Sequence, residues 1–127
     1  MLVADDEYIN KVKVVRELIV KTLRSMGFQV EVEGFVIGES GIRHKFDIVA
    51  SSHNRKLAID FVLPPKDVNI ATLASCAKAI DLKDFKTVVV LPVNAKDELM
   101  FCPKQVTALF YDDVNSVIDK LGKIAES

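Results

Sequence analysis

The chain lacks the segments that mark membrane and secreted proteins. No apolar run reaches the roughly 20 residues that a membrane-spanning helix needs. The start, Met-Leu-Val-Ala-Asp-Asp-Glu, has acids where a secretory signal peptide has bases. We therefore expect a cytoplasmic protein with no membrane partner.

Cysteine is also scarce. Cys76 and Cys102 are the only two cysteines, and neither has a second cysteine or a histidine nearby at the spacing of a metal site. A disulfide or a zinc pair is therefore less well supported than two buried free thiols of an intracellular protein.

An excess of charge of one sign is missing as well. The chain has seventeen Lys and Arg residues and eighteen Asp and Glu residues, so its net charge is −1. Any surface for nucleic acid would therefore be a local patch rather than a property of the whole chain. The 127 residues, of which 50% are hydrophobic, are enough for one globular domain over residues 1–127 with a substantial core.

Apolar periodicity predicts a single α/β sandwich. We expect a helix over residues 5–26, strands over 28–37 with a bend at Gly34, 45–50 and 57–63, a helix over about 67–82 capped by Asp67 or Asn69, strands over 87–92 and 106–111, and a last helix capped by Asp112 or Asp113. Residues 94–103 suggest no more than one or two helical turns. Three antiparallel strands followed by a crossover helix predict a mixed sheet, with the order α-β-β-β-α-β-(α)-β-α.

Apolar residues three or four positions apart predict the buried face of each helix. These residues are Tyr8, Val12, Val15, Ile19, Leu23 and Met26 in the first helix, Ile70, Leu73, Ala77 and Ile80 in the crossover helix, and Val114, Val117, Ile118, Leu121 and Ile124 in the last.

The second and third predicted strands each carry one carboxylate in an apolar run. A tight turn centred on His53 and Asn54 would pair residues whose numbers sum to 107, and this register places Asp47 opposite Asp60. Like charges this close are destabilising unless a proton or a cation lies between them, so the pair suggests a divalent-metal site. The alternatives are that both face solvent, or that a shift of one residue puts them on opposite faces.

Four short segments carry a further signal: Arg16–Phe28, Ser40–Gly41, Phe46–Ala50 and Leu57–Asp60. Together they resemble the restriction endonuclease-like, or PD-(D/E)XK, superfamily, and most of all archaeal Holliday-junction resolvases and Mrr-type nucleases. The resemblance implies a restriction endonuclease-like three-layer sandwich that hydrolyses phosphodiester bonds in DNA with Mg²⁺ or Mn²⁺. In that family an aspartate on the second strand and an acid on the third bind the metal, and a lysine two residues later organises the attacking water.

Carried over to this chain, the resemblance makes Asp47 and Asp60 the catalytic metal ligands. Val62 stands where the family has its lysine, and an aliphatic side chain cannot offset the charge that develops on a phosphoryl group. The glutamate that the family often has on its first helix falls on Arg16, and Glu17 is rotated by about 100° around that helix. The motif is therefore degenerate.

Other basic side chains are candidates for the missing charge. The predicted pairing puts Lys45 opposite Val62, on the face of both aspartates, and this makes Lys45 a candidate catalytic residue. Lys66 and Lys78 are weaker substitutes. Ser40, Arg43 and His44 precede the same strand, and from the resemblance we expect them to contact the nucleic-acid backbone.

These observations predict a DNA-directed, metal-dependent phosphodiesterase or a degenerate relative of one. The alternative is a non-catalytic module that keeps the nuclease fold for protein association or nucleic-acid docking, and a third option is a small-molecule binder using the same cleft. The missing lysine leaves open whether the chain is an enzyme. By analogy with nucleases that act on two strands, we expect the protein to form a homodimer.

Overall fold

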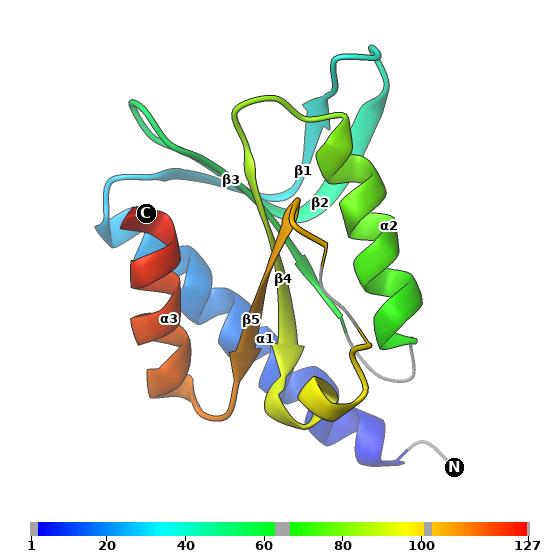
Figure 1. The fold of residues 1–127 in the computed structure, drawn as a ribbon. Coiled ribbons are helices and arrows are strands. Elements are labelled where there is room, and N and C mark those ends of the chain that lie inside the picture. The colour runs from blue at the N-terminus through cyan, green and yellow to red at the C-terminus, as the bar shows by residue number, and fades with distance from the viewer. Residues whose placement is uncertain (1–2, 63–66, 101–102, 127) are drawn as a thin grey trace.

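The computed structural model describes residues 3–62, 67–100 and 103–126, which form an α/β fold with a five-stranded mixed sheet and three α-helices (Figure 1). The elements are α1 (Val3–Ser25), β1 (Gln29–Ile37), β2 (Arg43–Ser51), β3 (Lys56–Phe61), α2 (Val68–Ile80), β4 (Lys86–Pro92), the 3₁₀ helix η1 (Val93–Asp97), β5 (Val106–Tyr111) and α3 (Val114–Glu126). Their order agrees with the prediction. Leu63, Lys66 and Cys102 lie outside the described residues, as do the side chains of Tyr8 and Val114.

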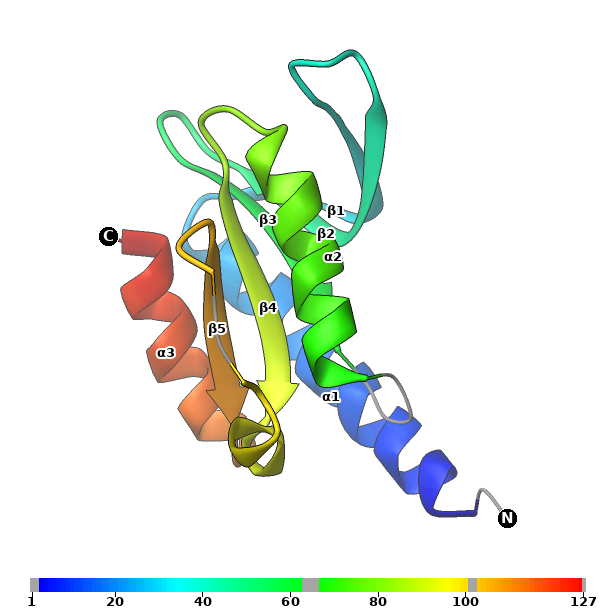
Figure 2. The same cartoon turned by 45° about the vertical axis from the view of Figure 1, so that its right-hand side comes forward.

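The strands lie in the order β1-β2-β3-β4-β5. The pairs β1–β2 and β2–β3 are antiparallel, whereas β3–β4 and β4–β5 are parallel. Helices α1 and α3 cover one face of the sheet and α2 covers the other, which gives three layers (Figure 2). None of the described helices is both long and apolar enough to cross a bilayer.

Carboxylates set the starts of α2 and α3, as helix capping requires. Asp67 Oδ1 accepts a hydrogen bond from the main-chain nitrogen of Ile70 at 3.0 Å, and Asp113 Oδ1 accepts one from Ser116 at 2.9 Å. Of the two caps considered for each helix, these are the residues that the structure uses.

The β2–β3 hairpin has the predicted register. Ile48 pairs with Ile59 and Ser51 with Lys56, so the paired residue numbers sum to 107. The Ser52 main-chain nitrogen donates to the Arg55 oxygen at 2.8 Å across the turn.

The β1–β2 ladder is interrupted opposite Asp47. It pairs Val32 with Ile48 and resumes at Gly34 and Phe46, while Glu33 between them has φ 52°, in the left-handed region. The predicted bend in β1 therefore lies at Glu33, one residue before Gly34.

The side chains of β2 pack on different faces of the sheet before and after this interruption. Ile48 belongs to the core cluster beneath α1 and α3. Phe46, two residues earlier, packs instead with Val36 and Ala58 in a separate cluster. Regular alternation would have put Phe46 and Ile48 on one face, so side-chain directions change around Asp47.

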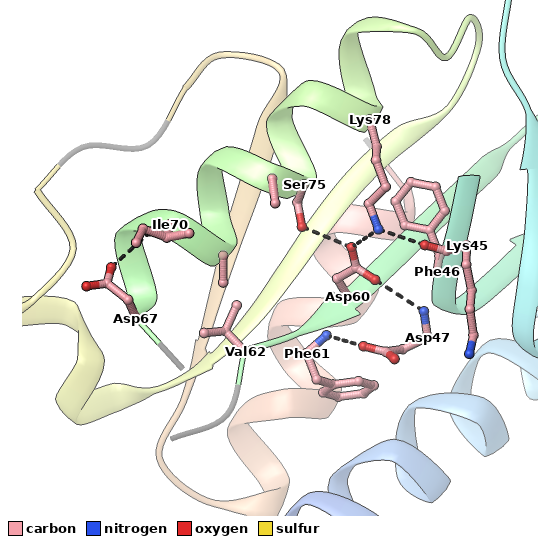
Figure 3. Close-up of a pocket in the computed structure, with 12 residues that line it drawn as sticks. Lys45, Phe46, Asp47, Asp60, Phe61, Val62, Asp67, Ile70, Ser75 and Lys78 are labelled. Atoms are coloured by element: carbon pink, nitrogen blue, oxygen red, sulfur yellow. Dashed lines mark hydrogen bonds and ion pairs between the residues drawn. The ribbon is translucent and has the colours of Figure 1, made fainter. Parts of the chain in front are cut away.

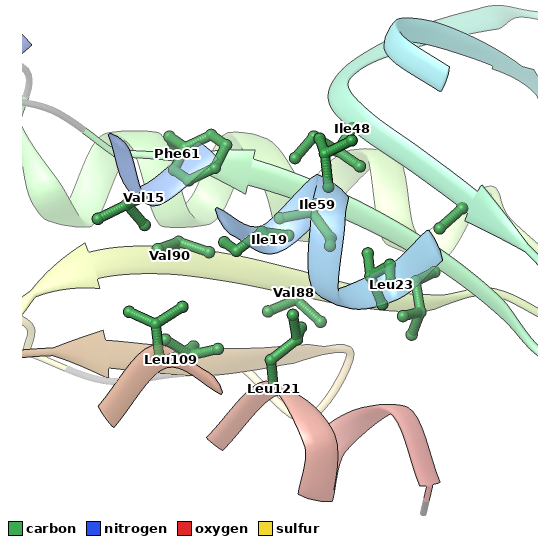
Figure 4. Close-up of a cluster of buried hydrophobic side chains, with 14 of the residues drawn as sticks. Val15, Ile19, Leu23, Ile48, Ile59, Phe61, Val88, Val90, Leu109 and Leu121 are labelled. Carbon is green, nitrogen blue, oxygen red and sulfur yellow. The ribbon is translucent and has the colours of Figure 1, made fainter. Parts of the chain in front are cut away.

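The larger core cluster lies between the sheet and the pair α1 and α3 (Figure 4). It includes Val15, Ile19 and Leu23 of the predicted α1 stripe, together with Ile48, Ile59, Phe61, Val88, Val90, Leu109 and Leu121. On the other face, Val89 and Leu91 of β4 pack beneath α2. Strand β4 is thus buried on both sides, as its apolar sequence predicts.

The prediction of the buried face of α2 was wrong. Val68, Thr72, Ser75 and Cys76 are buried against the sheet. Ile70, Leu73 and Ile80 of the predicted face are 68%, 45% and 66% exposed. The reason is that small side chains let this helix lie close to the sheet and let Ser75 reach Asp60.

We expect the α1 side of the core to dominate stability. Leu23 is fully buried, so Leu23→Ala should cost about 2–5 kcal/mol of unfolding free energy through lost transfer energy and the cavity left behind. Urea denaturation measures this loss. The control Ile37→Ala removes a side chain that is 69% exposed and should cost well under ~1 kcal/mol; equal losses in the two variants would contradict the core assignment.

Candidate functional site

A cavity of about 510 Å³ lies between α2 and the adjacent ends of β2 and β3 (Figure 3). Asp47 and Asp60 both line it, as does Lys45. Apolar side chains, among them Phe61 and Ile70, form much of the remaining wall. The two carboxylates that the sequence analysis singled out therefore border one pocket that is open to solvent.

The two aspartates bridge the point where β2 and β3 separate. The ladder between these strands ends at Ile48 and Ile59. Beyond it, the main-chain nitrogen of Asp47 donates to Asp60 Oδ1 at 3.2 Å, and the main-chain nitrogen of Phe61 donates to Asp47 Oδ2 at 2.7 Å (Figure 3). Each carboxylate thus accepts a hydrogen bond from the backbone of the opposite strand, and this fixes both at the cavity.

Helix α2 supplies the other contacts of Asp60. Its Oδ2 accepts from Ser75 Oγ at 2.9 Å and from Lys78 Nζ at 2.7 Å. The Lys78 ammonium also donates to the Lys45 carbonyl oxygen at 2.7 Å and lies 4.1 Å from the centroid of the Phe46 ring. With its side chain only 25% exposed, Lys78 is held in one place beside Asp60.

Lys45 takes a different position from the one expected. Its Nζ lies 3.3 Å from Glu33 Oε1, and the Lys45 side chain is 55% exposed. The predicted pairing with Val62 does not occur, because the β2–β3 ladder ends at Ile48 and Ile59 and β2 changes face around Asp47. The ammonium beside Asp60 belongs to Lys78, which the sequence offered as a weaker candidate.

The α1 residues at and beside the position of the family's first-helix glutamate do not line this cavity. Arg16 and Glu17 line a separate hollow on α1 together with Val32 of β1. Glu17 is exposed there, next to Lys21 and Arg24.

The donor set for a metal consists of two carboxylates. Within residues 3–62, 67–100 and 103–126, no group of three or more His, Cys, Asp or Glu side chains is placed to share an ion. Asp47 and Asp60 offer hard oxygen ligands, and Mg²⁺ is commonly held by one or two carboxylates with water and substrate phosphates in the other positions. The chemistry of the pair therefore fits Mg²⁺ or Mn²⁺.

A second polar cluster, which the sequence did not reveal, joins the turn between β1 and β2 to the end of α2. Asp81, the C-cap of α2, accepts from Ser40 Oγ at 2.6 Å and from the Ser40 main-chain nitrogen at 2.9 Å. His44 Nε2 lies 2.7 Å from Asp81 Oδ2. A Cβ at Gly38 would lie 1.9 Å from Asp81 Oδ2, so this close approach requires glycine there.

Two of the three residues expected to contact nucleic acid belong to this cluster. Ser40 and His44 are both turned towards Asp81, while the Arg43 guanidinium lies over the Phe35 ring, 4.1 Å from its centroid. Sequence analysis did not single out Asp81, because 41 residues separate it from Ser40 and 37 from His44.

The Asp81 contacts predict a dependence of stability on pH. The Ser40 hydroxyl, then His44 and the Ser40 main chain, lower the pKa of Asp81 from 3.8 to about 2. A carboxyl with a lowered folded-state pKa stabilises the fold above its unfolded pKa, and this contribution is lost as the pH falls towards the folded value. Urea titrations should therefore show Asp81→Asn less stable than wild type at about pH 5, with the gap closing from about pH 4 to pH 2.

The control for this experiment is Asp119→Asn, which alters an exposed aspartate on α3. Its unfolding free energy should follow that of wild type over the same pH range. A gap between wild type and Asp81→Asn that stayed constant down to pH 2 would contradict the role given to the ionised carboxylate.

Comparison with known proteins adds information on the fold alone. No family model and no curated protein matches the sequence. The chain is similar in fold to the crystal structure of the protein of unknown function AF1548, with a TM-score of 0.53 and 12% sequence identity over 86% of this chain and 67% of that one.

Proposed function

We propose that this protein is a DNA-directed, metal-dependent phosphodiesterase, or a degenerate relative of one, with a restriction endonuclease-like fold. The observation that carries the proposal is the pair Asp47 and Asp60, which project from adjacent strands into one cavity with an ammonium 2.7 Å from the second carboxylate. Phosphoryl transfer needs little more from a protein than positioned oxygen ligands for a cation and positive charge near the reacting phosphate.

The residues of the cavity have distinct roles in this proposal. Asp47 and Asp60 hold the cation, and Ser75 together with the backbone contacts keeps Asp60 oriented. A bound Mg²⁺ would supply Lewis-acid stabilisation of a phosphoryl oxygen and a more acidic water. Lys78 supplies the fixed positive charge that the family places on its third strand, where this chain has Val62.

The arrangement of elements supports the same proposal. Both aspartates lie on the strands that the resemblance requires, next to the last pair of the β2–β3 ladder, Ile48 and Ile59, and a helix crosses from β3 to the parallel strand β4. Lys78 reaches the site from that helix. A basic group from a neighbouring element can take the electrostatic role of the strand lysine because the role depends on the position of the charge.

Metal binding tests the donor pair. Titration of Mg²⁺ and Mn²⁺ into wild type should release or absorb heat with saturation at one site, and both Asp47→Ala and Asp60→Asn should lose it because two carboxylates form the donor set. The matched control Asp119→Asn changes an exposed aspartate on α3 and should bind as wild type. Equal heats in all four proteins would exclude Asp47 and Asp60 as ligands.

Cleavage of DNA tests the charge donor. On branched and linear duplexes with Mg²⁺, Lys78→Met should lower the cleavage rate by about 100-fold or more, because it removes the positive charge that lies 2.7 Å from Asp60. Lys45→Met should cleave within a few-fold of wild type, since that ammonium pairs with Glu33. If Lys45→Met lost most of its cleavage rate while Lys78→Met stayed active, Lys45 rather than Lys78 would be the charge donor.

A non-catalytic module is the second candidate, and a specific observation favours it. Asp47 and Asp60 already accept hydrogen bonds from the backbone, and Asp60 also pairs with Lys78, so both have structural partners without an ion. Absence of heat and of cleavage in wild type, combined with a loss of stability in Asp60→Asn, would favour this candidate over the phosphodiesterase.

A further inference from the structure

A hollow of about 490 Å³, the amino-end hollow, lies where the parallel strands β3, β4 and β5 begin. Its wall comes from the β2–β3 turn, the starts of the three strands and the last turn of α3. It shares no lining residue with the cavity of Asp47 and Asp60. Its volume lies within the roughly 300–1,000 Å³ of pockets that hold small ligands.

Positive charge dominates the lining of this hollow. The charged side chains that line it are four cations and one carboxylate, namely Arg55, Lys56, Lys86, Lys104 and Asp84. The whole chain has a net charge of −1, so this excess of positive charge is a local concentration. Charges of one sign around a concave surface raise the local concentration of counter-ions, so the hollow suits an anion.

Two of the four cations contact the end of α3. Arg55 Nη2 donates to the Glu126 carbonyl oxygen at 2.8 Å, and Lys86 Nζ donates to the Ile124 carbonyl oxygen at 3.2 Å. The last carbonyl groups of a helix carry partial negative charge, which would repel an anion. Arg55 and Lys86 offset that charge, so the positive charge of the other two cations is in excess.

These other two cations are Lys56 and Lys104. Neither forms an ion pair with a carboxylate in the part of the chain that the structure describes. The Lys56 ammonium lies 5.6 Å from the centroid of the Phe85 ring, which also lines the hollow and packs against the buried cluster that contains Phe46. Lysine ammonium groups bind phosphate oxygens through short, charge-assisted hydrogen bonds. Both side chains can therefore serve a bound phosphate.

A buried hydroxyl group lines the same hollow. Thr87 is 2% exposed, and its Oγ1 has no hydrogen-bond partner among residues 3–62, 67–100 and 103–126. The large majority of buried side-chain polar atoms have a partner, so a hydroxyl without one needs an explanation. An anion oxygen in the hollow would supply the acceptor that this hydroxyl lacks.

We propose that the amino-end hollow binds a short chain of phosphate groups, as in inorganic triphosphate or in a nucleoside diphosphate or triphosphate. Lys56 and Lys104 neutralise the phosphates, and Thr87 donates a hydrogen bond to one of their oxygens. Asp84 lines the hollow too and opposes the anion. Several positive charges around one small volume match a multiply charged anion better than a singly charged one.

A small anion fits this hollow better than a DNA duplex. A duplex presents its phosphates as a long, regular array of charge. The cations here come instead from separate segments and surround one concave volume at the end of the sheet. Because the lining is distinct from that of the Asp47 and Asp60 cavity, phosphate binding and phosphodiesterase activity can fail independently.

Equilibrium dialysis of the full chain against inorganic triphosphate tests the site. EDTA is present, so that no divalent cation links the phosphates to Asp47 and Asp60. Wild type should saturate at one site per chain. Lys56→Gln and Lys104→Gln should each weaken binding by about tenfold, because each removes a charge-assisted contact. The matched control Lys83→Gln removes the same charge from an exposed lysine outside the lining and should bind within about twofold of wild type.

Two further variants separate binding from folding. Thr87→Val should weaken triphosphate binding by about threefold or more, while the urea midpoint of the unliganded protein stays equal or rises, because the hydroxyl has no partner to lose. Asp84→Asn removes the opposing charge and should tighten binding by about threefold. Asparagine suits this position, since Asp84 has φ 68° and asparagine tolerates the left-handed region.

Parallel dialysis against ADP and ATP identifies the source of the phosphates. Tighter binding of ATP than of inorganic triphosphate indicates a nucleotide, and equal or weaker binding indicates that the phosphate chain alone is recognised. Both results support the site if Lys56→Gln and Lys104→Gln weaken them.

Three results would overturn the phosphate site. The first is no saturable binding of triphosphate, ADP or ATP by wild type. The second is an equal loss of binding in Lys83→Gln and Lys56→Gln, which would indicate diffuse attraction to surface charge. The third is a loss of binding in Lys78→Met with none in Lys104→Gln, which would place the anion in the cavity beside Asp60. Duplex DNA that needs Lys56 and Lys104, in a protein that does not bind triphosphate, would make the hollow a nucleic-acid contact instead.

Discussion

The separation of β2 from β3 at Asp47 is the constraint on which the site depends. Main-chain N–H groups at the end of a ladder need acceptors, and leaving one buried without a partner costs on the order of 1–3 kcal/mol. Here the acceptors are the carboxylates of Asp47 and Asp60, each reaching across to the opposite strand. The same bonds that close the end of the ladder hold two negative charges at the edge of a cavity.

Helix α2 contacts both Asp60 and the turn between β1 and β2. Its inner face brings Ser75 and Lys78 to Asp60, and its C-cap Asp81 holds the turn between β1 and β2 through Ser40. The inner face buries the polar Thr72 and Ser75 beside Val68 and Cys76, and the larger apolar side chains Ile70, Leu73 and Ile80 lie on the outer face. The polar site and these exposed apolar side chains are therefore two consequences of one helix orientation.

Local patterns predicted much of this structure. The bounds of β5 and the register of the β2–β3 hairpin follow from turn residues and alternation within a few positions. The same local signals narrowed the cap of α2 to Asp67 or Asn69 and the cap of α3 to Asp112 or Asp113, and the structure uses Asp67 and Asp113. Asp47 and Asp60 lie next to the last pair of that register, Ile48 and Ile59, and both line one cavity.

Features that depend on distant contacts were not predictable in this way. The α2 sequence carries two possible buried faces, and only the position of Asp60 on the sheet decides between them. Lys45 was misplaced because regular alternation was assumed through Asp47, where the left-handed Glu33 interrupts the neighbouring ladder. Asp81 reaches Ser40 and His44 from the far end of α2, so no local pattern could indicate it.

Under the proposed function, the charges around the cavity determine what a lysine from α2 would contribute. Asp47, Asp60 and Lys78 together carry one net negative charge at neutral pH, which still attracts a divalent cation. With that cation bound the site would carry one net positive charge, the complement of a single phosphodiester. Without the ammonium, the site and its cation would be neutral, and the extra charge that develops on the phosphoryl group would have no added positive group nearby to offset it. The same ammonium also partners Asp60 when no cation is bound, and it thereby lowers the cost of keeping two carboxylates on adjacent strands. One residue thus reconciles the stability of the metal-free fold with the electrostatics that catalysis would require.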